Sequence, residues 1–329
     1  MNIFEQQKAN RKDTVYLIFI IILFLSAVGF GYDYFILKID PFHLFESSPQ
    51  SIRSNVPVGT LGALLLSILM SLYSYFCGDF FVLKSCGACL LSTKAEKNFS
   101  EKQLENIVDE MTIASGLPRP KLYIVEDPDP NAFATGRDPK HASIAVTRGL
   151  LEKLNREEVQ GVIAHEMSHV QNFDIRYMCV VAVLIGAAVL AADWARRSLF
   201  YGRRGRSSSD RKGGGAALFF VIWVILIILT PILGQIMAMC VSRKREYLAD
   251  ASGAQLTRNP IGLAKALEKI EQAAEPTLSI KKGTAHLCIS DPLGKTMGLK
   301  EGFWADLLST HPPISERIKK LKEMAYLYS

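Results

Sequence analysis

Four uncharged, apolar segments constrain the fold of this 329-residue chain more than any other feature. A helix needs about 20 apolar residues to cross the hydrocarbon core of a bilayer. Thr14–Tyr32 and Ser54–Gly78 are long enough to do so, and Gly213–Ser242 is long enough with tilt, whereas Tyr177–Ala192 is marginal. Hydrophobic residues make up 49% of the chain. The sequence therefore predicts a mainly α-helical membrane protein with four transmembrane helices.

The formal net charge of +6 is explained by membrane topology. The basic residues concentrate beside the apolar segments, and no recognisable nucleic-acid-binding module accompanies them. Lys8, Arg11 and Lys12 precede the first segment, which is too long for a signal peptide and lacks a clear cleavage site. We expect an uncleaved anchor with a cytoplasmic N-terminus, contacts with the lipid bilayer, and no nucleic-acid partner.

The apolar segments divide the chain into four parts. Residues 1–83 form an N-terminal membrane region with two helices, and residues 84–176 are the first part of a polar domain. Residues 177–242 form a transmembrane hairpin with a basic loop, and residues 243–329 are the second part of the polar domain. Helical periodicity in Leu263–Ile270 and Ile314–Met324 predicts that this second part is largely helical.

The first polar part has the pattern of a small α+β fold. Helical spacing over Glu101–Ser115 stops before a glycine, and Lys121–Glu126 and Ser143–Thr147 are typical of strands. A helix over Leu150–Leu154 follows the second strand. We therefore expect a small β-sheet, one edge of which could hold an extended peptide by backbone hydrogen bonds.

His165-Glu166-Met167-Ser168-His169 is the motif that carries chemistry. Residues four apart lie on the same face of a helix, so the two imidazoles converge on one point. Neutral histidine nitrogens suit zinc, and Glu166 is placed to act as general base on a water in an open coordination position. The alternative is an ordinary amphipathic helix with two exposed histidines.

A catalytic zinc site needs a third protein ligand, and Glu246 is the best candidate. It begins a helical stretch in which Asp250, one turn later, could accept a hydrogen bond from the far nitrogen of a ligand histidine. In a plainer interpretation, both carboxylates only offset the charges of Arg243–Arg245 at a membrane edge.

These residues and several others resemble the HtpX-type integral-membrane zinc metalloproteases, relatives of the CAAX prenyl proteases. The resemblance runs in the family's order from Gly78-Asp79 to near the C-terminus. It rests on four stretches: Pro130–Gly136; His165–His169 with Asn172 and Asp174; Ser242-Arg243 through Glu246 and Asp250; and Thr310–Ile314 with Glu316, Arg317 and Ile318. The basic loop Arg196–Lys212 and the sequence of the first apolar segment depart from the family pattern.

The resemblance implies a zincin-type (gluzincin) cytoplasmic domain with one Zn²⁺ on His165, His169 and Glu246, and with Glu166 as base. It also implies that Asn131 lies near the bound peptide, and that His311 or Arg317 steadies the oxyanion. His311 could instead cap a helix, and Arg317 could pair with an acidic surface.

The same resemblance implies a zinc endopeptidase of the bacterial inner membrane, with its active site on the cytoplasmic side. Its substrates would be misfolded or damaged membrane proteins or peptides, in a stress-response role shared with other membrane proteases of quality control. One alternative is a processing protease for a single membrane or lipidated substrate. A second, non-enzymatic alternative is a membrane scaffold with a structural metal site, but such a site has no use for Glu166.

Two rules conflict over the topology of residues 177–242. His169 and Glu246 must reach one ion, so the chain between them crosses the membrane an even number of times. Two crossings place Arg196–Lys212, with seven basic residues, outside, against the positive-inside rule. A hairpin that enters the bilayer without crossing it satisfies both rules. The length of Gly213–Ser242 favours two crossings.

Overall fold

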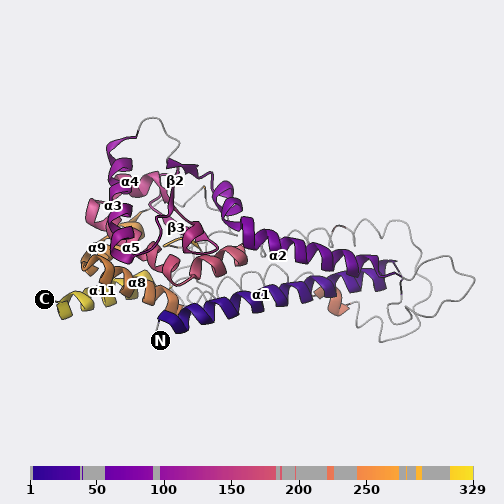
Figure 1. Ribbon diagram of the computed structural model, residues 1–329. Helices are drawn as coiled ribbons and strands as arrows, with labels where there is room; N and C mark the ends of the chain where they lie inside the picture. Colours follow the sequence, from indigo (N-terminus) through magenta and orange to yellow (C-terminus); the bar gives the residue numbers. More distant parts are fainter. Residues whose placement is uncertain are drawn as a thin grey trace, which may run out of the picture. The chain divides into compact units, whose positions relative to one another are not determined.

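The computed structural model describes residues 3–37, 39, 56–91, 97–182, 186, 197, 221–225, 243–273, 279, 287–290 and 312–328 (Figure 1). The chain forms two compact units. The first comprises Met1–Thr14, Tyr75–Val183 and Ile236–Ser329, and the second comprises Val15–Ser74 and Leu184–Gln235.

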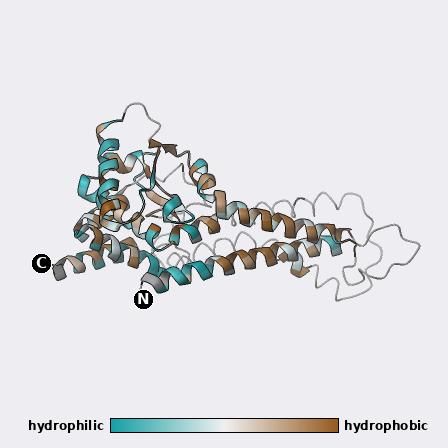
Figure 2. Ribbon diagram, viewed as in Figure 1, coloured by the Kyte–Doolittle hydropathy of each residue, from teal (hydrophilic) through white to brown (hydrophobic). Residues whose placement is uncertain are grey.

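Two long helices, α1 (Ile3–Tyr32) and α2 (Val58–Ser85), correspond to the first two apolar segments. By length and composition, Gln7–Leu37 and Val58–Ser85 are the spans among the described residues that could cross a membrane. Figure 2 shows a hydrophilic beginning of α1 followed by a hydrophobic stretch. Of the third and fourth predicted spans, the described parts are residues 177–182, 186 and 221–225, which are helical; the remainder lies outside the described residues, as does the basic loop apart from Arg197.

In the second unit, a residue that directly follows α1, Asp33, caps the beginning of α2. A π-helix over Asp33–Leu37 follows α1, and Asp33 is fully buried. Its carboxylate accepts hydrogen bonds from the backbone N–H groups of Gly59 and Thr60, at 2.7 and 2.6 Å. The first N–H groups of a helix have no partner within the helix, so this carboxylate supplies one.

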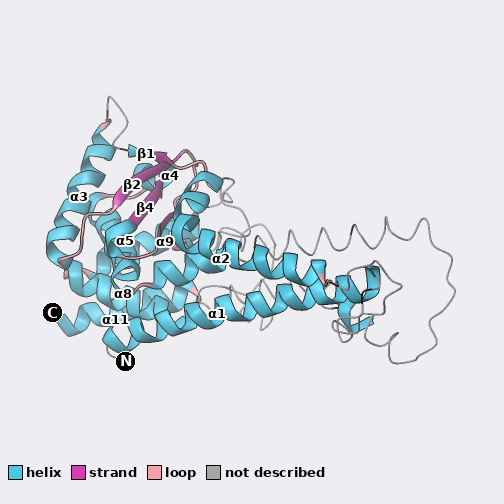
Figure 3. Cartoon of the chain, turned by 45° about the vertical axis from the view of Figure 1, so that its right-hand side comes forward, coloured by secondary structure: helices cyan, strands magenta, loops and turns pink. Residues whose placement is uncertain are grey.

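The small sheet of the first unit has four strands in the order β1-β2-β4-β3. They are β1 (Cys89–Leu90), β2 (Lys121–Val125), β3 (Ala132–Gly136) and β4 (Ala142–Thr147). β2 and β4 pair in parallel, whereas β1 with β2 and β3 with β4 are antiparallel. β2 and β4 match the two predicted strands and lie side by side in Figure 3. In the strand order, β3 forms an edge of the sheet.

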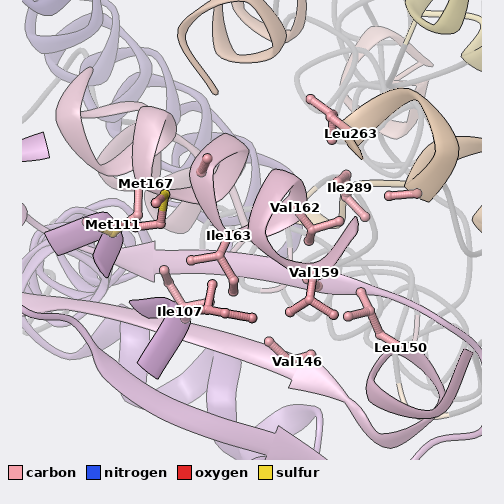
Figure 4. Packing of buried hydrophobic residues seen from close by; sticks show 14 of the residues in the cluster. Ile107, Met111, Val146, Leu150, Val159, Val162, Ile163, Met167, Leu263 and Ile289 are labelled. Carbon is pink, nitrogen blue, oxygen red and sulfur yellow. The ribbon is translucent and has the colours of Figure 1, made fainter. Parts of the chain in front are cut away.

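Helices flank this sheet in the first unit. α3 (Phe99–Ser115) begins at a capping box between Asn98 and Glu101 and ends at Gly116, whose φ of 66° suits a residue without a side chain. α4 (Arg148–Lys153) follows β4 directly, and α5 (Arg156–Gln171) follows α4. In Figure 4 the apolar side chains of α5 lie against those of α3, β4 and α4; the residues are Val159, Ile163, Met167, Ile107, Val146 and Leu150.

The C-terminal part of the chain completes the same core. α8 (Arg243–Thr257) and α9 (Pro260–Gln272) pack against α5, and α11 (Ile314–Tyr328) packs against α9 and α8. The predicted helices over Leu263–Ile270 and Ile314–Met324 lie within α9 and α11. The two polar parts of the sequence therefore share one hydrophobic core, with α5 in contact with both.

Candidate metal centre

Helix α5 presents its two histidines on one face. Asn155 caps the helix: its side chain accepts from the Glu158 backbone, and the Glu158 side chain accepts from the Asn155 backbone. Further along the helix, the Nε2 atoms of His165 and His169 lie 3.2 Å apart, and both side chains are buried. The histidines are therefore not the exposed pair of the plainer interpretation.

Glu246, near the beginning of α8, brings a carboxylate to the same point. Its oxygens lie 3.8 Å from His165 Nε2 and 3.5 Å from His169 Nε2. Close contact between α5 and α8 depends on Gly253, because a Cβ there would lie 3.0 Å from the backbone nitrogen of His165. Absence of a side chain at this position allows α8 to carry Glu246 to the histidines.

The spacing of the three side chains fits a small divalent ion. Ligand atoms about 2.0–2.1 Å from a tetrahedral zinc lie roughly 3.3 Å from one another. The separations here are 3.2, 3.5 and 3.8 Å. The donor set of two imidazole nitrogens and one carboxylate is also one that zinc favours. These residues therefore form a group that fits a metal ion.

Each histidine has a carboxylate beside its other ring nitrogen. Asp250 Oδ1 lies 3.0 Å from His165 Nδ1, and Asp174 Oδ2 lies 3.0 Å from His169 Nδ1. A carboxylate at Nδ1 holds the proton on that nitrogen and leaves the lone pair of Nε2 for a metal. Both carboxylates are buried, so their positions are set by the fold.

The two carboxylates have different surroundings. Arg317 is fully buried and donates to both oxygens of Asp250, at 2.8 and 2.7 Å. Burial alone raises the pKa of Asp250, but the guanidinium outweighs it and lowers that pKa to about 2. Burial lowers the pKa of His165. For His169, burial is outweighed by its hydrogen bond to Asp174 and the charge of Glu246, and the pKa rises to about 9.

Glu166 is buried next to the first histidine. Burial raises its pKa to about 7, and the charge of Glu246 also raises it. The backbone of Ala134 in β3 hydrogen-bonds to this carboxylate, and its Oε2 atom has no hydrogen-bond partner among the described residues. A carboxyl with a pKa near neutrality is suited to taking up and giving back a proton.

The remaining predicted site residues lie in different places. Asn131, just before β3, is buried, and its side-chain nitrogen lies 3.3 Å from the carbonyl oxygen of Ser290. Next to it, the backbone N–H of Ile289 donates to the carbonyl of Ala132 at 3.0 Å. One end of the β3 edge is therefore paired with residues 287–290 of the same chain. His311 lies outside the described residues.

Arg317, on α11, lies next to Asp250, the carboxylate beside His165. Besides Asp250, it donates to the carbonyl of Ile289 at 2.9 Å, and its Nη1 lies 3.6 Å from Glu246. Arg317 therefore contacts the carboxylate beside one histidine and the third member of the candidate metal group. It does not pair with an exposed acidic surface.

Two parts of the site received no role from the sequence, although Asp174 is among the residues that carry the family resemblance. Asp174 lies beyond the end of α5, where the four-residue helical spacing no longer applies, and a turn at Phe173 with a φ of 60° leads to it. β3 received no strand assignment, because Ala132–Gly136 has one aromatic and one β-branched residue and ends in glycine. For Asp174, the sequence signal that could have assigned a role is that it is an acidic residue five positions after His169.

Comparison with known proteins places the chain among proteases. The model of a family described as peptidase family M48 matches residues 98–325. A "Protease HtpX homolog" of Caldanaerobacter subterraneus subsp. tengcongensis is 45% identical over 269 residues, which are 81% of this chain and 86% of that protein. One from Dictyoglomus thermophilum is 38% identical over 321 residues, covering 98% and 94% of the two chains.

A solved structure also overlaps the chain. The crystal structure of S. mikatae Ste24p covers 97% of this chain and 67% of its own, at 19% sequence identity. Its TM-score of 0.47 is too low to support an argument about the site.

Proposed function

Because the chain belongs to peptidase family M48 and is a membrane-bound metalloprotease, we propose that it is a zinc endopeptidase with one ion on His165, His169 and Glu246. The observation that carries this proposal is the buried cluster of two imidazoles and one carboxylate. The two Nε2 atoms lie 3.2 Å apart, His169 Nε2 lies 3.5 Å from Glu246 Oε1, and His165 Nε2 lies 3.8 Å from Glu246 Oε2. A purely structural zinc site is normally closed by four protein ligands. Three ligands with Glu166 beside them support a catalytic site.

In the proposed mechanism, Glu166 moves the proton. Zinc, when bound, lowers the pKa of a water in its open position and polarises the scissile carbonyl. Glu166 accepts the proton of the attacking water and gives it to the leaving amine. The Glu166 carboxylate is buried beside the first proposed ligand, and its Oε2 atom has no hydrogen-bond partner among the described residues, so it can take the proton. Asp250 and Asp174 keep the histidine rings oriented throughout.

The ligand assignment is tested by zinc content and activity measured on the same purified protein. Glu246→Ala is expected to lose zinc, whereas Glu166→Gln is expected to keep one zinc per chain and lose hydrolysis. Glu271→Ala makes the same change at an exposed position of α9 and is the matched control. Full zinc occupancy in Glu246→Ala would refute the assignment, and hydrolysis by Glu166→Gln would refute the role of the base.

The proposed position of the substrate peptide is along β3 from Ala134 onward, because residues 287–290 already pair with Ala132 and Phe133. Ala134, in the middle of this edge strand, contacts the Glu166 carboxylate through its backbone. The side-chain amide of Asn131 donates to a main-chain carbonyl, that of Ser290, which is the kind of contact it would make with a peptide backbone. Backbone hydrogen bonds along an edge strand hold a peptide independently of its side chains. This suits an enzyme that acts on many damaged or misfolded proteins.

We further propose that the substrates are membrane proteins and that the enzyme works in quality control. The similarity to proteins named HtpX and the two apolar helices support this proposal. The test compares cleavage products in membranes containing the active enzyme with those containing Glu166→Gln. Products from many unrelated membrane proteins would support quality control. Products from a single protein would instead identify a dedicated processing protease.

The proposed topology has four spans in a bacterial inner membrane, with the metal centre on the cytoplasmic side. His169 and Glu246 lie in one site, so the chain between them crosses an even number of times. Two crossings place the basic loop on the far side. A single cysteine near Ser208, after replacement of the native cysteines, should react with a membrane-impermeant thiol reagent in intact cells. Labelling only after lysis would reject the four-span topology.

A further inference from the structure

The first turns of α1 lie against the end of α5, within the first unit. Gln7 donates from its side chain to the carbonyl of Gln171 at 2.8 Å, and Asn10 donates to the carbonyl of Asn172 at 2.9 Å. The last carbonyl groups of a helix have no partner within that helix. Two side chains from a segment more than 160 residues away therefore cap the helix that carries both histidines.

Asn10 makes a second contact that Gln7 does not make. Its Nδ2 also donates to Asp174 Oδ1, at 2.5 Å, and the other oxygen of Asp174 lies 3.0 Å from His169 Nδ1. Both partners of this amide nitrogen are pure acceptors, so the orientation of the amide is determined by its surroundings. Asn10 and Asp174 are each 1% exposed. The Asn10 amide therefore orients the Asp174 carboxylate, which in turn orients the His169 ring.

We propose that Asn10 is a positioning residue for His169, acting through Asp174. This inference rests on the proposed assignment of His169 as a metal ligand. Groups that orient a ligand histidine affect metal affinity because they fix the ring and the nitrogen that carries its proton. Because the Asn10 amide is neutral, it fixes the orientation of Asp174 without adding a charge to the site. The first helix of the chain is therefore part of the metal centre as well as a membrane anchor.

A charged pair next to this contact strengthens the docking of α1. Arg245 Nη2 lies 2.8 Å from the carboxylate of Asp13, one turn along α1 from Asn10. Arg245 directly precedes Glu246, and its Nε lies 3.8 Å from Asp174. The same short segment of α1 therefore contacts the end of α5 and the beginning of α8, the two helices that supply the proposed ligands.

The test measures how fast zinc leaves the full-length protein in micelles when a chromogenic chelator is added. Glu166→Gln is the background for every variant, so that proteolysis does not interfere. Replacement of residues that orient a metal ligand typically weakens metal affinity by about 10- to 100-fold. Asn10→Ala is expected to release zinc about tenfold faster than its parent. Gln7→Ala removes a cap on the same helix without touching Asp174, so it is the matched control and should stay within about twofold.

A double-mutant cycle separates positioning from general stabilisation. If Asn10 acts through Asp174, Asn10→Ala should add little to the zinc release of Asp174→Ala, whereas independent effects would add. Should Asn10→Ala fail to fold, Asn10→Ser also lacks the reach to Asp174 and replaces it. Zinc release at the parental rate, or full additivity, would overturn the inference. A parent that binds no zinc would instead overturn the proposed function itself.

Discussion

Replacement of Arg317 should separate the stability of the fold from the retention of metal. This guanidinium is fully buried and donates to both oxygens of Asp250 and to the carbonyl of Ile289. The Asp250 carboxylate in turn lies 3.0 Å from His165. Arg317→Met removes the positive charge, keeps much of the side-chain volume, and leaves Asp250 as a buried carboxylate without its main partner.

The expected loss of stability is large for a single substitution. Removing one partner of a buried ion pair costs about 3–5 kcal/mol, mostly because the other charge stays buried. For a domain of 150–250 residues, 1 kcal/mol corresponds to roughly 2–4 °C in Tm. Arg317→Met should therefore lower Tm by roughly 6–20 °C. The control is Lys322, which lies on α11 like Arg317 and forms an exposed ion pair with Glu268 of α9; Lys322→Met should cost at most about 1 kcal/mol.

The double variant Arg317→Met, Asp250→Leu tests whether the unpaired charge of Asp250 causes the loss of stability. Replacing both partners with apolar residues removes the unpaired charge of Asp250, so part of the lost stability should return; the contacts of Arg317 with Ile289 and Glu246 stay lost. Zinc retention should not return, because His165 Nδ1 no longer has its carboxylate. The assays are thermal unfolding of the metal-free variants in micelles, so that bound zinc does not contribute to Tm, and zinc content of separate samples of the same variants. A double variant that unfolds as early as Arg317→Met, or one that binds zinc like the wild type, would refute this account.

Three further predictions concern other parts of the chain. Asn131→Ala should lower kcat/KM by up to about tenfold, the value of one buried hydrogen bond, at unchanged zinc content; unchanged kinetics would make its contact with Ser290 purely structural. Gly161→Ala places a Cβ 2.7 Å from the backbone of α9 and should cost about 1–3 kcal/mol in thermal unfolding, whereas Gly62→Ala meets nothing within 4 Å and is the control. Asp33→Ala removes the cap of α2 and should cost about 1 kcal/mol; an unchanged Tm would contradict the capping role.

Local sequence signals predicted most of the helices and two of the strands. Helical spacing predicted α3 over Glu101–Ser115, and Gly116 marks its end because glycine adopts the left-handed conformation there without strain. The capping residues Asn98 and Asn155, which begin α3 and α5, are seen in the structure. β4 is buried along its whole length, and β2 is buried at Leu122, Ile124 and Val125, so both contain short runs of apolar residues. β3 lacks that composition: its position is set by pairing with β4 and by the contact of Ala134 with Glu166. Such long-range determinants leave no periodic pattern.

The candidate site was predictable to the extent that its geometry is helical. Residues four apart on α5 must share a face, so His165 and His169 were found directly from their spacing. Glu246 and Asp250 follow the same rule on α8. Asn10 could not be found in this way, because its partner is 164 residues away and the contact exists only in the folded chain. Helical spacing shows which residues share a face of one helix. It does not show which distant segments of the chain pack against that face.

The balance of buried charge in the candidate metal centre favours a divalent cation. Four buried carboxylates surround the two histidines, and two buried guanidinium groups accompany them; the residues are Glu166, Asp174, Glu246, Asp250, Arg245 and Arg317. With these six groups ionised and both imidazoles neutral, as metal ligands must be, the protein groups carry four negative and two positive charges, a net charge of −2. Buried charges are costly unless they are paired or bound to a metal, and one divalent ion neutralises this excess. Asn10 fits the same balance, because an aspartate there would add a fifth carboxylate and repel Asp174, whereas a neutral amide donates to it.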